Sequence, residues 1–138
     1  MGYSYYSYLV LLTDESDFSL AELAARLEHF YGKAGQGNVA VVTKEESLKV
    51  KVGDYAFQLH YNQEDYVVEE SQEIAEDAAT NHPDKARIAA CRRRLEIAGE
   101  DDPDMDYFND SLYLLEIIET FSGVFIFDPY DGRFLSKD

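Results

Sequence analysis

The order of apolar and polar residues near the start of the chain indicates a buried strand. Residues 5–13 alternate as far as Tyr8 and then run apolar on both faces through residues 9–12. This pattern is typical of a central strand that is covered on both sides. We therefore expect the first strand to lie inside a sheet.

A helix is expected next, because its start and stop signals are both present. Ser19 is followed three residues later by Glu22, which makes a capping box. Apolar residues then recur at helical spacing through residues 20–31, and Gly32 is a natural C-terminal stop. The pattern predicts a helix that begins at Ser19 or Leu20 and ends near Gly32.

Three short segments with strand patterns follow this helix. They cover residues 39–43, 48–52 and 55–61, and the last two alternate apolar and polar residues with period two. Gly53 and Asp54 form a turn between them. The segments predict a three-stranded meander with one face toward a core.

The second half of the chain has mainly helical spacing. Weak apolar stripes at residues 67–78 and 88–98 predict two helices, the second ending at Gly99. A last helix is expected from about residues 102–104 to Phe121. A short apolar strand at residues 124–127 and a turn that returns residues 133–135 to the sheet complete the pattern.

This order of elements predicts one α+β domain over residues 1–138. We expect a mostly antiparallel sheet of about five strands with helices on one face, in an elaborated ferredoxin-like (split βαβ) arrangement. If helices cover one face alone, the apolar side chains of the other face need a second copy of the chain or a partner protein.

Charge narrows the classes of partner. The chain carries 12 Lys and Arg against 28 Asp and Glu, a formal net charge of −16 at pH 7. Such a field repels nucleic acid and anionic lipid headgroups, and no apolar run approaches the roughly 20 residues that a membrane span requires. We expect no binding to nucleic acid or membranes. A single cysteine and the lack of a signal-peptide pattern favour a cytoplasmic protein.

The negative charge is unevenly distributed. Residues 53–84 contain nine acidic residues and no Lys or Arg, and residues 95–132 contain eleven and none. Acidic helices of this kind can simply be solvated and keep a protein soluble. Alternatively, they form an electrostatic surface that attracts a basic protein.

The second interpretation defines a set of candidate partner-binding residues. Tyrosine suits interfaces because it is both apolar and hydrogen-bonding, and the chain has eleven tyrosines and no tryptophan. Sheet packing is the other explanation of the tyrosines, because tyrosine is also a good strand residue. The candidate residues are Glu69, Glu73, Asp102, Asp104, Asp106, Tyr107 and Asp110.

The Asp-rich part of this set permits other interpretations. The spacing of Asp102, Asp104 and Asp106 is that of the start of a calcium loop, but Tyr107 and Tyr113 stand where such a loop needs Gly and Glu. The carboxylates can also cap the last helix. In a helical hairpin they would be ion-pair partners for Arg87 and Arg94, residues that could otherwise bind an anion.

Catalytic signatures are absent from the sequence. The histidines His29, His60 and His82 have no ligand spacing, and there is no nucleophile elbow or phosphate loop. Cys91 falls on the apolar stripe of the expected 88–98 helix, which predicts a buried, inert thiol. Three consecutive arginines at 92–94 point in different directions on a helix and cannot converge on one ligand. We expect no enzyme activity, metal or cofactor.

The sequence thus favours a non-catalytic acidic protein-binding domain. In size, charge and lack of catalytic signature it resembles immunity-type or antagonist proteins that neutralise a basic partner. One alternative is a structural or regulatory homodimer formed through the sheet face. Another is a small-ligand binder with a pocket between sheet and helices, into which His60, Tyr61 or Arg94 could project.

Overall fold

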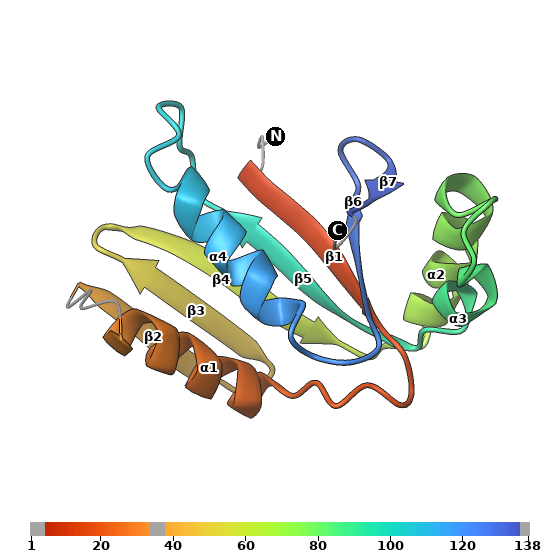
Figure 1. Cartoon of the computed structure of the whole chain (residues 1–138), viewed down its shortest axis with the longest axis horizontal. Helices are drawn as coiled ribbons and strands as arrows, with labels where there is room; N and C mark the ends of the chain where they lie inside the picture. Colours follow the sequence, from red (N-terminus) through yellow and green to blue (C-terminus); the bar gives the residue numbers. More distant parts are fainter. Residues whose placement is uncertain (1–4, 34–37, 136–138) are drawn as a thin grey trace.

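A computed structural model describes residues 5–33 and 38–135, which form a single antiparallel sheet with helices (Figure 1). The elements in chain order are β1 (Tyr5–Leu12), α1 (Leu20–Lys33), β2 (Val39–Lys44), β3 (Ser47–Val52), β4 (Tyr55–Asn62), α2 (Tyr66–Ala78), α3 (Lys85–Ala89), β5 (Arg93–Gly99), α4 (Phe108–Ile118), β6 (Val124–Asp128) and β7 (Arg133–Phe134). None of the helices in these residues is long and apolar enough to cross a membrane.

The sheet has seven strands in the order β2-β3-β4-β5-β1-β6-β7, and all neighbours are antiparallel. The α+β class and the antiparallel sheet are confirmed, but the expected number of about five strands is wrong. Because β5 and β6 are both antiparallel to β1, they run in the same direction on either side of it, and α4 lies between them in the chain. The ferredoxin-like arrangement is not confirmed by this order.

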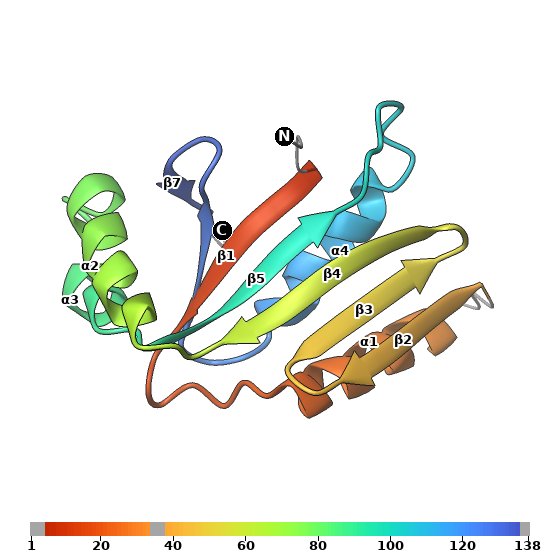
Figure 2. The same ribbon diagram turned by 180° about the vertical axis from the view of Figure 1, so that it is seen from behind.

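Helices pack on both faces of the sheet, so the expectation of helices on one face is wrong. Alternate residues of β1 show this directly. Val10 and Leu12 belong to the core that includes residues of α1 and α4, whereas Leu11 packs with Ala75 of α2 and Ile88 of α3. Figure 1 shows α1 and α4 across one face, and Figure 2 shows that the opposite face of β2–β5 is largely uncovered.

The local signals in the first half of the chain are confirmed. The Ser19 hydroxyl oxygen accepts a 3.1 Å hydrogen bond from the Glu22 backbone N–H, and α1 begins at Leu20. The meander forms as β2, β3 and β4, with Gly53 at a φ of 61° in the turn before β4. These elements depend on short-range patterns that tertiary contacts reinforce.

The expected helix at residues 88–98 is wrong. The structure has only the short α3 there, followed by β5 between β4 and β1. Leu95 and Ile97 of β5 enter the main core, while Arg94 and Glu96 point to the opposite face. Pairing with two neighbouring strands overrides the helical propensity of this segment.

Arg94 attaches α2 to the face of the sheet opposite α1 and α4. Its buried guanidinium lies 2.7 Å from a Glu70 oxygen and 2.8 Å from a Glu96 oxygen, and Asn62 donates to the same Glu96 carboxylate. Burial opposes ionisation of Glu96, but the donors Asn62 and Arg94 outweigh it and lower its pKa. The expected pairing of Arg94 with the Asp102–Asp106 segment is therefore wrong.

Arg87 also pairs elsewhere, because it contacts Asp84 and Glu15. The last helix starts later than expected, at Phe108. Met105, with a φ of 59°, adopts a left-handed conformation that does not continue a right-handed helix. The segment before α4 is therefore a structured loop and not a first helical turn.

Candidate functional site

One hollow that combines exposed apolar and acidic side chains lies beside the first half of β1. We call it the aromatic groove; its volume is about 260 Å³. It is formed by β1, the loop before α4, the first residue of α4 and the end of β6 with the turn that follows. Its lining residues are Tyr5, Tyr6, Ser7, Tyr8, Met105, Phe108, Asp128 and Tyr130.

Unusual backbone geometry is concentrated at this groove. Within the described residues, positive φ angles at non-glycine positions occur at Tyr6, Glu45 and Met105, and two of these line the groove. The pairing of β1 with β5 also shifts register between Tyr5 and Tyr8, as in a β-bulge. Such conformations persist where the surrounding structure holds them, and they are common at binding sites.

Asp102 holds the wall of the groove together. It is 4% exposed, and its carboxylate accepts hydrogen bonds from the Tyr6 hydroxyl at 2.5 Å and from the Asp106 and Tyr107 backbone N–H groups at 3.0 and 2.9 Å. Burial opposes its ionisation, yet these three donors lower its pKa below the usual value. Asp102 is thus a structural anchor inside the candidate site.

Tyr107 fixes the same loop to the sheet. Its ring stacks on Tyr55 with centroids 4.3 Å apart and an interplanar angle of 13°. The Tyr55 hydroxyl in turn donates a 2.6 Å hydrogen bond to the Glu100 carbonyl. The loop is therefore pinned at both ends, which orders the residues between them.

The apolar lining of the groove is unusually exposed. Met105 is 52% exposed, Phe108 40% and Tyr130 74%. These residues come from two segments that are far apart in sequence, and the fold gathers them around one hollow. Exposed apolar groups that adjoin one another mark interaction surfaces more often than the same groups scattered singly.

Carboxylates occur in both segments that supply this apolar lining. Asp104 and Asp106 flank Met105, are exposed, and form no ion pair within the described residues. Asp128 lines the groove itself. In the adjoining turn Asp131 lies 3.9 Å from Arg133, which partly offsets its negative charge. The rim of the groove is consequently negative.

The rim also influences Tyr8. Burial, followed by the negative charges of Asp128 and Asp131, raises the pKa of the Tyr8 hydroxyl. Like any tyrosine it is protonated at neutral pH, and its hydroxyl can act as a hydrogen-bond donor or acceptor.

The structure divides the predicted partner-binding residues into two groups. Asp104 and Asp106 are exposed and adjoin the groove residue Met105 in the chain, while Asp102 and Tyr107 hold the loop from inside. Asp110 is also engaged internally, since it accepts a 2.9 Å hydrogen bond from Tyr31. Two residues, Glu69 and Glu73, lie on the exposed side of α2, at the other end of the molecule (Figure 1).

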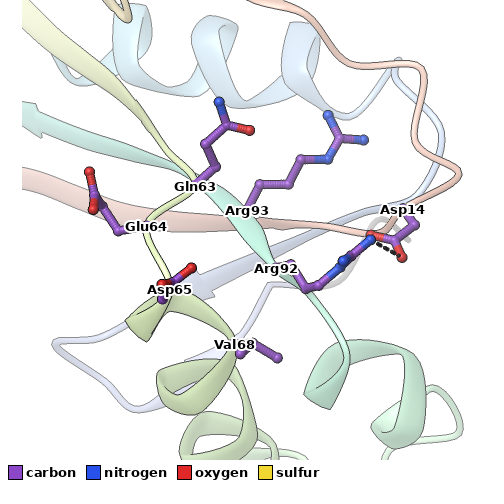
Figure 3. A pocket seen from close by; sticks show the side chains of 7 residues that line it. All are labelled: Asp14, Gln63, Glu64, Asp65, Val68, Arg92 and Arg93. Atoms are coloured by element: carbon purple, nitrogen blue, oxygen red, sulfur yellow. Dashed lines mark hydrogen bonds and ion pairs between the residues drawn. The ribbon is translucent and has the colours of Figure 1, made fainter.

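A second hollow of about 460 Å³ lies where β1 and β4 end and α2 and β5 begin (Figure 3). Its lining residues are Asp14, Gln63, Glu64, Asp65, Val68, Arg92 and Arg93. The Arg92 guanidinium contacts Asp14 at 3.0 Å, and Arg93 donates to the carbonyl oxygens of Thr13 and Ser16. Because both cations are engaged and three carboxylates line the hollow, it does not have the charge of an anion site.

The residues of the expected ligand pocket are not brought together. His60 lines a small hollow with Ser47 and Glu96 on the uncovered face of the sheet. Tyr61 stacks on Phe18 within the main core, with ring centroids 6.3 Å apart. Arg94 faces α2. These three side chains therefore do not form one cavity between sheet and helices.

The described residues hold neither a cluster of metal ligands nor an exposed thiol. They contain no group of three or more His, Cys, Asp or Glu side chains arranged to hold a metal ion. Cys91 is completely buried, as its apolar neighbours predict, although it follows α3 and does not lie within a helix. Burial raises the pKa of its thiol to about 12.

Comparisons with protein-family models, with curated proteins and with solved structures found no match for this chain. Function is therefore inferred from the residues and geometry of the chain itself. The sequence analysis named Asp104 and Asp106, which are exposed, but did not name Met105 and Phe108 of the groove lining. Their exposure was the missing information, since an apolar residue near a helix start reads as part of a core.

Proposed function

We propose that this chain is a non-catalytic protein-binding domain that recognises a basic partner through the aromatic groove. The observation that carries the proposal is the exposure of Met105, Phe108 and Tyr130 around one hollow, with the exposed carboxylates of Asp104 and Asp106 on either side of Met105 in the chain. Aromatic and methionine side chains are enriched at protein interfaces, where a few residues, often tyrosine or tryptophan, carry most of the binding free energy. Carboxylates at the rim steer a basic partner and select against acidic ones.

An immunity-type or antagonist role is the form of this function that the charge favours. The net charge of −16 would accelerate association with a basic protein and make the complex sensitive to salt. The exposed carboxylates of Glu69 and Glu73 on α2 are a second acidic surface that the same partner could contact.

A homodimer formed through the uncovered sheet face is the alternative. This face carries the exposed side chains of Val42, Lys49, Lys51, Gln58 and His60. Val42 is 49% exposed and favours burial, but its neighbours are polar or charged. Stable homodimer interfaces are more apolar than this, so the groove is the better-supported surface.

The test is capture of a partner by tagged protein from its native lysate at low and at high salt, followed by titration of the purified partner. The diagnostic variant is Asp104→Lys/Asp106→Lys. The matched control is Glu28→Lys/Glu46→Lys, which makes the same change in charge at exposed positions on α1 and in the β2–β3 turn. Circular dichroism establishes that both variants are folded.

We expect the wild type and the control to bind a basic protein at low salt, and the groove variant to bind at least about tenfold more weakly. Tyr130→Ser should weaken binding as well, because it removes an exposed aromatic side chain. Equal binding by groove variant and control would refute the groove as the site. Loss of binding only in Glu69→Lys/Glu73→Lys would move the site to α2.

A further inference from the structure

The first half of β1 has a strand neighbour on one side only, within the described residues. β6 pairs with β1 from Leu9 to Leu12, with Leu9 opposite Phe127. On the other side, β5 continues to pair with β1 as far as Tyr5. In the described residues, the edge of β1 from Tyr6 to Tyr8 therefore lies beside the aromatic groove without a strand paired to it.

The turn after β6 explains why the pairing stops. The Asp128 carboxylate accepts hydrogen bonds from the Tyr130 and Asp131 backbone N–H groups, and the Asp128 carbonyl accepts one from Gly132. This closes a tight turn that contains Pro129, which has no N–H to donate. The chain turns away from β1 toward β7 instead of extending β6 (Figure 1).

From this geometry we propose that the aromatic groove takes a basic segment of its partner in extended conformation, as a short strand added along Tyr6–Tyr8 of β1. The inference rests on the proposed function and specifies its mode of recognition. A strand edge that is left open within a sheet is a ready template for another chain. Backbone hydrogen bonds supply affinity in this mode, and flanking side-chain sites supply specificity.

The side chains around the edge define the partner segment. Successive side chains of an added strand point to opposite faces. One set would meet the apolar lining at Met105 and Phe108, which favours aliphatic or aromatic residues. Lys or Arg residues of the other set would lie near Asp128, which lines the groove and favours charge-assisted hydrogen bonds. The segment is therefore one that alternates basic and apolar residues.

The test uses a synthetic fluorescent peptide, Lys-Val-Arg-Val-Lys-Val, and two versions that are N-methylated at alternate backbone amides. In an added strand only one alternate set of amides faces β1, so one methylated peptide loses its hydrogen bonds and the other keeps them. Charge and side chains are the same in all three. Fluorescence anisotropy with the full chain measures each dissociation constant.

We expect the parent and one methylated peptide to bind with similar affinity and the other to bind at least about tenfold more weakly, the effect of losing one to two hydrogen bonds. The parent should also bind Asp104→Lys/Asp106→Lys more weakly than Glu28→Lys/Glu46→Lys. Hydrogen exchange should show protection of the β1 backbone around Ser7 and Tyr8 when the parent is bound.

Two results would overturn strand addition. If both methylated peptides bind as tightly as the parent, or if the parent shows no saturable binding, the partner is not held as an added strand. Neither result bears on the capture experiment with the rim variants. A captured basic protein that needs Asp104 and Asp106 would preserve the proposed function while this mode of binding fails.

Discussion

The Tyr6 hydroxyl donates a 2.5 Å hydrogen bond to Asp102, joining the first strand of the chain to a loop 96 residues later. Tyr6 has a φ of 56°, so its side chain leaves the bulged strand in a direction that regular β-structure would not give. Asp102 in turn organises the loop that presents Met105. One contact therefore stabilises two walls of the aromatic groove.

Removing this hydroxyl should destabilise the protein measurably. In Tyr6→Phe the Asp102 carboxylate loses a donor while the ring still packs, and we expect a loss of about 2 kcal/mol in the free energy of unfolding, typical of hydrogen bonds to charged groups. Urea denaturation followed by circular dichroism measures it. Tyr113→Phe, whose hydroxyl has no hydrogen bond in the described structure, should change stability by less than about 0.5 kcal/mol. Equal effects in both variants would contradict the assignment.

Asp102 should also give the protein a pH-dependent stability. Its folded-state pKa is lowered from the model-compound value of 3.8, so it stabilises the folded state above that pH and loses this contribution as pH falls through the folded pKa. Asp102→Asn should therefore be clearly less stable than wild type at pH 7, and the difference should shrink below about pH 4. Urea unfolding of both proteins across this range is the measurement. A constant difference would mean that the charge of Asp102 is not what matters.

The ion pairs of Arg94 should contribute far more than those of exposed arginines. Its side chain is 8% exposed and lies between Glu70 and Glu96, so Arg94→Ala leaves a partly buried carboxylate without its cation. We expect a loss of about 3 kcal/mol. Arg92→Ala removes an exposed pair with Asp14 and should cost less than about 1 kcal/mol. Similar losses for the two variants, measured by urea unfolding, would show that Arg94 does not anchor α2.

The Cys91 thiol should be unreactive in the folded protein. It is completely buried and donates a hydrogen bond to the Arg87 carbonyl, and burial raises its pKa to about 12. Since the thiolate is the reactive form, a thiol-specific chromogenic reagent at pH 8 should label it only after denaturant is added. Labelling without denaturant at the rate of a free thiol would show that the segment between α3 and β5 opens readily.

The candidate site was only partly visible in the sequence. Asp104 and Asp106 stand out because the acidic run contains no Lys or Arg, and they are exposed on either side of Met105 in the chain. Asp102 has the same residue type and spacing but is buried. Tyr130 lies far along the chain and reaches the groove through the turn after β6. Which carboxylate is buried, and which apolar residues meet, depends on contacts between segments that no local pattern encodes.

The sequence by itself determined the elements whose signals are local. The capping box at Ser19 starts α1, and alternation with a glycine turn forms β3 and β4. Tertiary structure decided that Arg93–Gly99 forms a strand and not a helix, because Leu95 fits a helical stripe as well as a strand. Pairing with β4 and β1 supplies hydrogen-bond partners for the backbone of this segment. Glu70 of α2 provides a carboxylate that pairs with the buried Arg94. Those partners lie far away in sequence, and only the folded chain supplies them.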